Sequence, residues 1–200
     1  MKKIVLLLVS VLAINLANAQ DSEMPKAAFS KGDMWLEGGI ALTTGDTKDD
    51  YFAVTPKFGY FLDNKWAIGV DINYSSVSYL PNANDWDQSD SFGIGGFARY
   101  YFLSLGNFKA FGEAGLGYNH SKLQYDDGGS NVSNGIKANI DLGINYFFTP
   151  HWAATFTLAE ILSYNNAKPE DGDNTSDLEI NINLFNNIFA QPKFGLLYKW

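Results

Sequence analysis

Side chains that could serve as a nucleophile or a general base are few in this sequence. Its 200 residues include two histidines and no cysteine, so thiol catalysis and zinc–thiolate sites are excluded. His120 directly precedes Ser121, but neighbouring residues of a β-strand point to opposite faces, so they cannot act as a dyad there. His151 follows Pro150 in a predicted turn. We therefore expect no catalytic residue, no cofactor and no enzymatic activity.

The charged side chains occur at regular positions in the sequence. In segments where apolar and polar residues alternate, the large apolar residues fall at even positions and the charged residues at odd ones. A period of two is typical of β-strands, so one face of each strand carries the charges. Glu160 is the exception, and we expect it at a bulge or at the outer rim. The charged odd positions are Asp33, Glu37, Lys57, Asp71, Arg99, Lys109, Glu113, Lys137, Asp141, Glu179, Lys193 and Lys199.

Eight alternating segments follow one another along the chain. Each has at least the roughly 9 to 11 residues that a tilted membrane-spanning strand needs. Three connections between them, at 63–65, 104–107 and 149–151, are short, and the other four are long and polar. Short turns on one side and longer loops on the other are typical of membrane barrels. The segments cover residues 33–44, 51–62, 66–79, 91–103, 108–121, 134–148, 152–164 and 178–200.

A soluble β-sandwich and a barrel in lipid would both show this alternation. Glycines accompany the charges on the odd face, which suits a tightly curved wall around a narrow interior. Aromatic residues of the even face gather at both ends of the segments, as the girdles of membrane barrels do, whereas a sandwich core has no reason for two belts. We therefore predict an all-β fold, an eight-stranded antiparallel up-and-down transmembrane β-barrel over residues 33–200.

The N-terminal residues predict export. Lys2 and Lys3 precede an apolar run over residues 4–14, and Ala17-Asn18-Ala19 has the pattern of a cleavage site, so residues 1–19 indicate a signal peptide. Residues 20–32 are then expected to form a flexible periplasmic lead. Without the two lysines, 12 basic and 22 acidic side chains remain. That negative balance argues against nucleic acid as a partner.

The short turns also predict which charges face each other. Opposite residues of a hairpin have position numbers with a constant sum, so a turn centred on Asn64 places Lys57 opposite Asp71. The turn near residue 106 does the same for Arg99 and Glu113. We interpret these charges as a plug that fills the lumen and sets the strand register; a polar gate or a proton path is the alternative. The expected lumen charge network consists of Glu37, Lys57, Asp71, Arg99, Glu113 and Asp141.

The long connections carry 12 acidic residues and few basic ones. We interpret them as a solvated surface. The alternative is that divalent cations bridge these carboxylates to lipopolysaccharide phosphates. Residues 171–177 are rich in oxygen donors but lack the closing glutamate of an EF-hand. No metal site is therefore predicted.

The end of the chain has a pattern of its own, in which apolar residues alternate up to a terminal aromatic residue. This C-terminal signature consists of Phe194, Leu196, Tyr198 and Trp200. Together with the stretches 56–62, 66–69 and 96–102, it resembles the outer-membrane protein β-barrel domain family, the OmpX-like and OmpW-like small barrels of Gram-negative bacteria. The resemblance covers the whole chain after the signal peptide. It implies that the signature is an insertion signal that the barrel-assembly machinery recognises.

The resemblance implies a location in the cell outer membrane, with outer-membrane lipid and lipopolysaccharide as partners. We expect a monomeric integral membrane barrel with a side-chain-plugged lumen and a structural or surface-interaction role. The alternative is a transporter of small hydrophobic molecules, as OmpW-like barrels are thought to be. A lateral opening or a continuous apolar lumen would favour that alternative. A lipid-modifying membrane enzyme is the most distant possibility.

Overall fold

The computed structural model describes residues 28–43, 49–79, 86–125, 128–170, 172–181 and 193–200. The predicted signal peptide and residues 20–27 of the predicted lead lie outside this range. The described residues form strands and no helix long and apolar enough to cross a membrane. The strands are β1 (Met34–Thr43), β2 (Asp50–Phe61), β3 (Trp66–Ser78), β4 (Trp86–Leu105), β5 (Phe108–Tyr125), β6 (Ser130–Phe147), β7 (Trp152–Pro169), β8 (Thr175–Ile180) and β9 (Lys193–Lys199).

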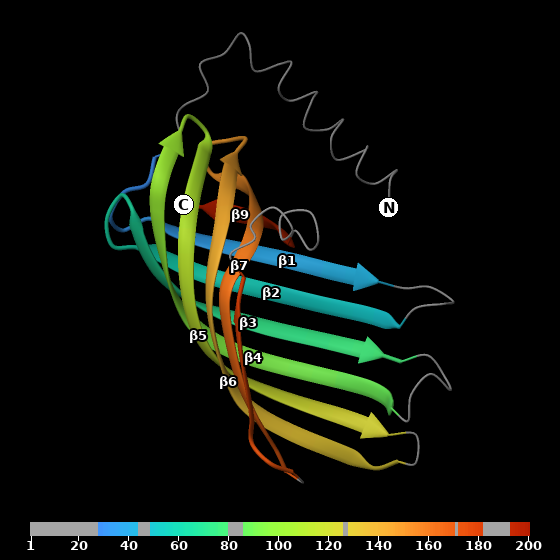
Figure 1. Cartoon of the computed structure of the whole chain (residues 1–200). Coiled ribbons are helices and arrows are strands. Elements are labelled where there is room, and N and C mark those ends of the chain that lie inside the picture. Colours follow the sequence, from blue (N-terminus) through green and yellow to red (C-terminus); the bar gives the residue numbers. More distant parts are fainter. Residues whose placement is uncertain (1–27, 44–48, 80–85, 126–127, 171, 182–192) are drawn as a thin grey trace.

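Antiparallel pairing of neighbouring strands closes the sheet into a barrel (Figure 1). From β1 to β7 each strand pairs with the next, and β9 lies between β1 and β7. Eight strands, β1–β7 and β9, thus form the ring, as predicted. Within the described residues, β8 is a ninth strand that pairs with β7 alone.

The prediction of one continuous strand over residues 178–200 is wrong. The edge of β7 that faces away from β6 pairs with β9 near its start and with β8 farther along. From Ile180 to Lys193 the chain advances 13 positions, while the partners on β7 advance only five, from Leu162 to Thr157. In one regular strand the two numbers would be equal, so β8 and β9 are separate strands.

Strand length divides the barrel into two parts. β1, β2 and β3 have 10, 12 and 13 residues, whereas β4 has 20 and β5, β6 and β7 have 18 each. The predicted long connections at 80–90, 122–133 and 165–177 were therefore too long, because polar residues continue the hydrogen-bonded ladders at their edges. We call residues 88–92, 119–125, 130–136 and 163–169, the outer ends of β4 to β7, the protruding wall.

Exposure follows the predicted parity. Even-numbered apolar residues on the outside of the strands are exposed, for example Val70 at 53% and Leu116 at 63%. Odd-numbered Phe61 and Arg99 are at most 1% exposed. An apolar outer surface that surrounds the whole barrel is far larger than the patches that soluble monomers expose. The outside of this barrel therefore suits contact with acyl chains.

The short turn between β2 and β3 is held by an aspartate side chain. The backbone N–H groups of Trp66 and Lys65 each donate a hydrogen bond of 2.7 Å to Oδ1 of Asp63. Both bonds, first that of Trp66 and then that of Lys65, favour the ionised carboxylate and lower the pKa of Asp63 from its ordinary value of 3.8. This turn fixes the register of β2 and β3, which places Lys57 opposite Asp71 as predicted.

Candidate functional site in the barrel interior

Aromatic side chains gather inside the barrel near the short turns. They form one buried cluster with Ala67, Ala153 and Leu197. We call the set Phe29, Phe61, Tyr101, Phe111 and Phe147 the aromatic floor; each of its members is at most 8% exposed. Eight strands enclose a space that side chains can fill, and here large rings occupy part of it. The sequence-based interpretation of a charged plug overlooked this layer.

Phe29 reaches the floor from outside the strands. It lies before β1, in the predicted lead, and its ring centre is 4.2 Å from that of Phe61, 4.5 Å from that of Tyr101 and 5.6 Å from that of Phe147. Offset and tilted ring pairs at such distances are favourable. The described end of the lead is therefore anchored in the barrel, in contrast to the predicted flexible segment.

A single buried arginine sits next to the floor. Nη1 of Arg99 donates to Glu37 at 2.8 Å, and Nε donates to Glu113 at 2.7 Å. The guanidinium carbon lies 4.5 Å from the ring centre of Trp35 and 4.0 Å from that of Phe111. Arginine is suited to this place because its planar group binds carboxylates at its edge and stacks on aromatic rings with its face. Arg99 thus joins both carboxylates and both rings across the lumen.

Hydrogen bonds extend from Arg99 around the interior. Thr155 donates to Glu37 at 3.1 Å, Asn145 donates to Thr155 at 2.7 Å, and the Tyr101 hydroxyl donates to Asn145 at 2.8 Å. On the other side Lys57 donates to Glu113. We call these seven residues the Arg99 network; they come from β1, β2, β4, β5, β6 and β7. Such a connected set of satisfied polar groups favours one arrangement of the strands.

The predicted lumen charges lie in the barrel interior, but their ion pairs are not those that strand register alone predicts. Arg99 faces Glu113 across the β4–β5 ladder, as predicted. Lys57 faces Asp71 in the β2–β3 ladder but forms its ion pair with Glu113. Asp141 neighbours Glu113 in the β5–β6 ladder and accepts a hydrogen bond of 2.6 Å from Asn139. Because the lumen is narrow, long side chains reach partners on non-adjacent strands.

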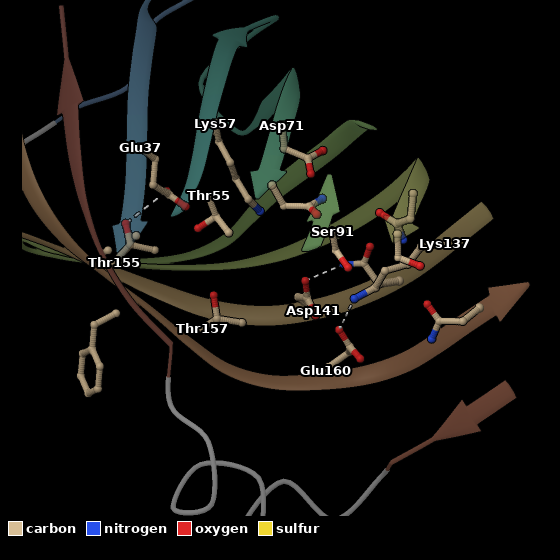
Figure 2. Close-up of a pocket in the computed structure, with 18 residues that line it drawn as sticks. Glu37, Thr55, Lys57, Asp71, Ser91, Lys137, Asp141, Thr155, Thr157 and Glu160 are labelled. Carbon is tan, nitrogen blue, oxygen red and sulfur yellow. Dashed lines mark hydrogen bonds and ion pairs between the residues drawn. The ribbon is translucent and has the colours of Figure 1, made fainter. Parts of the chain in front are cut away.

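On the far side of the Arg99 network from the floor lies a polar cavity of about 510 Å³ (Figure 2). Figure 2 shows Thr55, Asp71, Ser91 and Lys137 pointing into one common space from four strands. Half of its 18 lining residues are asparagine, serine or threonine. We call this space the outer cavity. Its neutral polar residues had no place in the predicted charge ring, although their odd positions in the sequence signal an inward direction.

Glu160 also lines the outer cavity, although it has an even number. The β6–β7 register shifts between Ile140 and Asp141 and again between Leu142 and Gly143. The predicted bulge is therefore confirmed. It turns Glu160 toward Lys137, whose Nζ lies 3.4 Å from Oε2.

Neither histidine hydrogen-bonds to a serine within the described residues. His120 is exposed, and its Nδ1 lies 2.8 Å from Oδ1 of Asn134. Ser121 lines the outer cavity instead, so the two adjacent side chains lie on opposite faces, as expected. His151 in the β6–β7 turn contacts the backbone oxygen of Lys199 at 2.8 Å. Among the described residues, no group of three His, Asp or Glu side chains could hold a metal ion.

Beside the outer cavity lies the place where the described pairing of β1 with β9 ends, which we call the seam. Pairing of β1 with β9 runs from Trp35 to Gly38, and within the described residues β1 has no partner on that side farther on. Gly39, Thr157, Phe194 and Gly195 line the cavity at this point. The C-terminal signature borders the seam from β9, with Phe194, Leu196, Tyr198 and Trp200 all exposed on the outside.

Comparison with solved structures supports the same architecture. Neisserial surface protein A matches with a TM-score of 0.50 and 17% identity over 86% of this chain and 98% of its own. The outer-membrane protein OprG from Pseudomonas aeruginosa matches with a TM-score of 0.53 and 15% identity over 88% and 99%. A major outer-membrane protein from Thermus thermophilus gives 0.51 and 10% over 84% and 99%. At these identities the likeness concerns the fold alone.

A search of curated protein sequences finds no match. The model of a protein family described as outer membrane protein beta-barrel domain, in contrast, matches residues 4–186 of this chain. That match spans most of the sequence and agrees with the closed ring and its apolar outer surface. The chain therefore belongs to the outer membrane protein β-barrel domain family.

Proposed function

We propose that this protein is exported through a cleaved signal peptide, is closed to flow across the outer membrane, and acts without catalysis through its outward-facing parts. The observation that carries the proposal is the stacking of two filled layers in the lumen. The aromatic floor and the Arg99 network lie next to each other and contain side chains that are almost wholly buried. In a barrel this narrow, such packing of side chains supports a lumen that is closed to water.

The protruding wall supports a surface-interaction role. Its strands continue past most of the apolar outer surface, and several outward side chains there are polar, including Asp90, His120 and Asn134, although Phe92 and Ile136 are exposed beside them. Hydrogen-bonded strands are a more rigid platform than loops. A rigid polar sheet beyond the acyl chains suits contact with lipopolysaccharide or with other molecules outside the cell.

Planar-bilayer conductance of the purified full chain tests the closed lumen. We expect no steady current. A variant with Phe29→Ala, Phe61→Ala and Phe147→Ala thins the aromatic floor, and current that appears only in this variant would identify the floor as the seal. Heat-modifiable migration on gels confirms that the variant still folds. Steady ohmic current through the unmodified protein would overturn the proposal.

A second candidate, uptake of small hydrophobic molecules, is favoured by the seam. The margins of the seam carry some of the most exposed apolar side chains, with Ile40 at 77%, Leu42 at 71% and Leu178 at 62%. A molecule that entered the outer cavity could leave sideways into lipid here. Cells that produce the protein would then take up N-phenyl-1-naphthylamine faster than cells that lack it. Gly39→Phe, which fills the seam, would abolish the difference; equal rates in all strains would exclude this candidate.

A further inference from the structure

The outer cavity has an unusual lining for a ligand pocket. Most small-molecule sites are lined mainly by apolar side chains with a few polar groups. Here amides and hydroxyls form half of the lining, and six charged residues and only one aromatic residue accompany them. The neutral donors and acceptors that line the cavity include Thr55, Asn73, Ser91, Asn119, Ser121 and Asn139.

Two of the amides are packed against a glycine that leaves room for them. A Cβ at Gly93 would lie 2.3 Å from Nδ2 of Asn73 and 2.3 Å from Oδ1 of Asn119. Gly93 faces Asn73 in the β3–β4 ladder and Asn119 in the β4–β5 ladder. Both amides therefore lie side by side over Gly93 at the cavity lining, and we call these three residues the amide platform.

The hydrogen-bonding capacity of this platform, and of Ser121, which lines the same cavity, is unused within the described part of the chain. No side chain or backbone group among the described residues hydrogen-bonds to the side chains of Asn73, Asn119 or Ser121. Each amide presents an acceptor and two donors, and the hydroxyl presents both functions. Asn139, by contrast, is already bound to Asp141. A ligand that carries many groups able both to donate and to accept would satisfy the platform.

The charges around the cavity select against anions. Glu37, Asp71, Asp141 and Glu160 line it with Lys57 and Lys137, so acids exceed bases. Both lysines are already engaged, Lys57 with Glu113 and Lys137 with Glu160. An anionic ligand would meet no free cation there and would be repelled by the excess of carboxylates. A neutral ligand meets no such penalty.

From this geometry we infer that the outer cavity binds a neutral saccharide, which the amide platform recognises through its hydroxyl groups. The inference rests on the proposed function, because a ligand held above a filled lumen is bound and not passed through. It deepens that proposal by naming the class of molecule that the outward-facing side of the barrel takes. The volume of about 510 Å³ lies within the range of roughly 300 to 1,000 Å³ for small-molecule sites.

Titration of the refolded full chain tests the inference, in a zwitterionic detergent because sugar-headed detergents would compete. The probes are sucrose, maltotriose and N,N′-diacetylchitobiose, with sucrose octasulfate as the anionic counterpart of sucrose. We expect saturable binding of at least one neutral probe, measured by calorimetry, with shifts of the Asn73 and Asn119 side-chain amide signals in NMR spectra. Sucrose octasulfate is expected to leave these signals unchanged.

Variants locate the site. Asn73→Leu and Asn119→Leu keep the approximate shape of the side chain but remove its polar groups, and each should weaken binding roughly 5-fold, the value of one hydrogen bond. Gly93→Ala should displace both amides and lower the affinity further. The matched control is Asn134→Leu, the same change on the outer surface, which should bind as the unmodified protein does. Heat-modifiable migration verifies folding for each variant.

Three outcomes would overturn the inference: no saturable binding of any neutral probe, tighter binding of sucrose octasulfate than of sucrose, or binding that the Asn73 and Asn119 variants leave unchanged. Conductance separates its failure from that of the proposed function. If the bilayer shows no steady current and no saccharide binds, only the saccharide inference fails. If steady current flows, the closed lumen on which the inference rests is refuted.

Discussion

The indole ring of Trp35 occupies the space in which a side chain of Gly59 would stand. The two residues are direct partners in the β1–β2 ladder, and a Cβ at Gly59 would lie 2.1 Å from Cε2 of Trp35. Because glycine leaves that space free, the indole lies against the wall and still reaches Arg99. The same arrangement recurs in two other ladder pairs, Phe97 over Gly69 and Phe111 over Gly143. Large rings fit into a narrow barrel in this way.

Gly59→Ala should therefore destabilise the barrel by about 1–3 kcal/mol, the usual cost of overpacking. The control is Gly38→Ala on β1, where a Cβ would meet nothing within 4 Å; its effect should stay within about 0.5 kcal/mol. Denaturant unfolding in lipid vesicles measures both. Adding Trp35→Leu to Gly59→Ala should recover part of the loss. Equal stability of the two glycine variants would contradict the proposed role of Gly59.

The register of the charged residues could be predicted from the sequence, but their ion pairs could not. Lys57 lies opposite Asp71 because a short turn fixes the sum of their positions. It binds Glu113 nonetheless, since a lysine side chain can cross a narrow lumen to a strand that is not its neighbour. The odd or even number of a residue predicts only whether its own side chain points into or out of the barrel. It holds no information on which side chains meet across the interior.

The aromatic floor and the divided eighth segment were missed for different reasons. Phe61, Phe111 and Phe147 have odd numbers and point inward by the same rule as the charged residues. Aromatic residues also form the outer girdles, so their residue type alone does not indicate a layer inside the barrel. The separation of β8 from β9 depends on how many residues lie between two ladders. Alternation of apolar and polar residues does not reveal this number, because the alternation continues through the residues between the two ladders.

Loss of Arg99 should be repaired better by changing Glu37 than by changing Glu113. Arg99→Met leaves two buried carboxylates and should cost about 3–5 kcal/mol. Glu113 keeps the ammonium group of Lys57, whereas Arg99 supplies the only ion pair of Glu37 among the described residues. Arg99→Met with Glu37→Gln should thus be more stable in denaturant than Arg99→Met with Glu113→Gln. The reverse order would show that Glu113, not Glu37, depends on the arginine.

The contribution of Asp63 to stability should disappear in acid. Hydrogen bonds from the backbone of Trp66 and Lys65 lower its pKa in the folded protein below 3.8. A lowered folded-state pKa stabilises the fold above the unfolded-state value, and this stabilisation is lost as the pH falls through the folded-state value. The unmodified protein should therefore be more stable than Asp63→Ala at neutral pH, with a difference that shrinks below pH 3.8. Asn64→Ala, in the same turn, should show a difference that is independent of pH.

Trp200 offers a way to separate an insertion signal from a lipid anchor. Its backbone pairs with β1 through hydrogen bonds of 3.0 and 3.2 Å to Met34, while the residue as a whole is 46% exposed on the outside. Trp200→Ala keeps the backbone bonds and removes only the ring, so unaided refolding into vesicles should change little. If the terminal aromatic residue is recognised by the barrel-assembly machinery, the variant should accumulate less folded protein in the outer membrane of cells.

The control for Trp200 is Trp152→Ala, which removes an indole that is 39% exposed and belongs to the same aromatic belt at the short turns. Both variants lose a comparable ring from the lipid interface, where indoles act as anchors. Only Trp200 lies in the C-terminal signature, so only its variant should show the defect in cells, measured as the heat-modifiable fraction of membrane extracts. Equal defects in the two variants would mean that the terminal ring anchors the barrel in lipid and carries no signal.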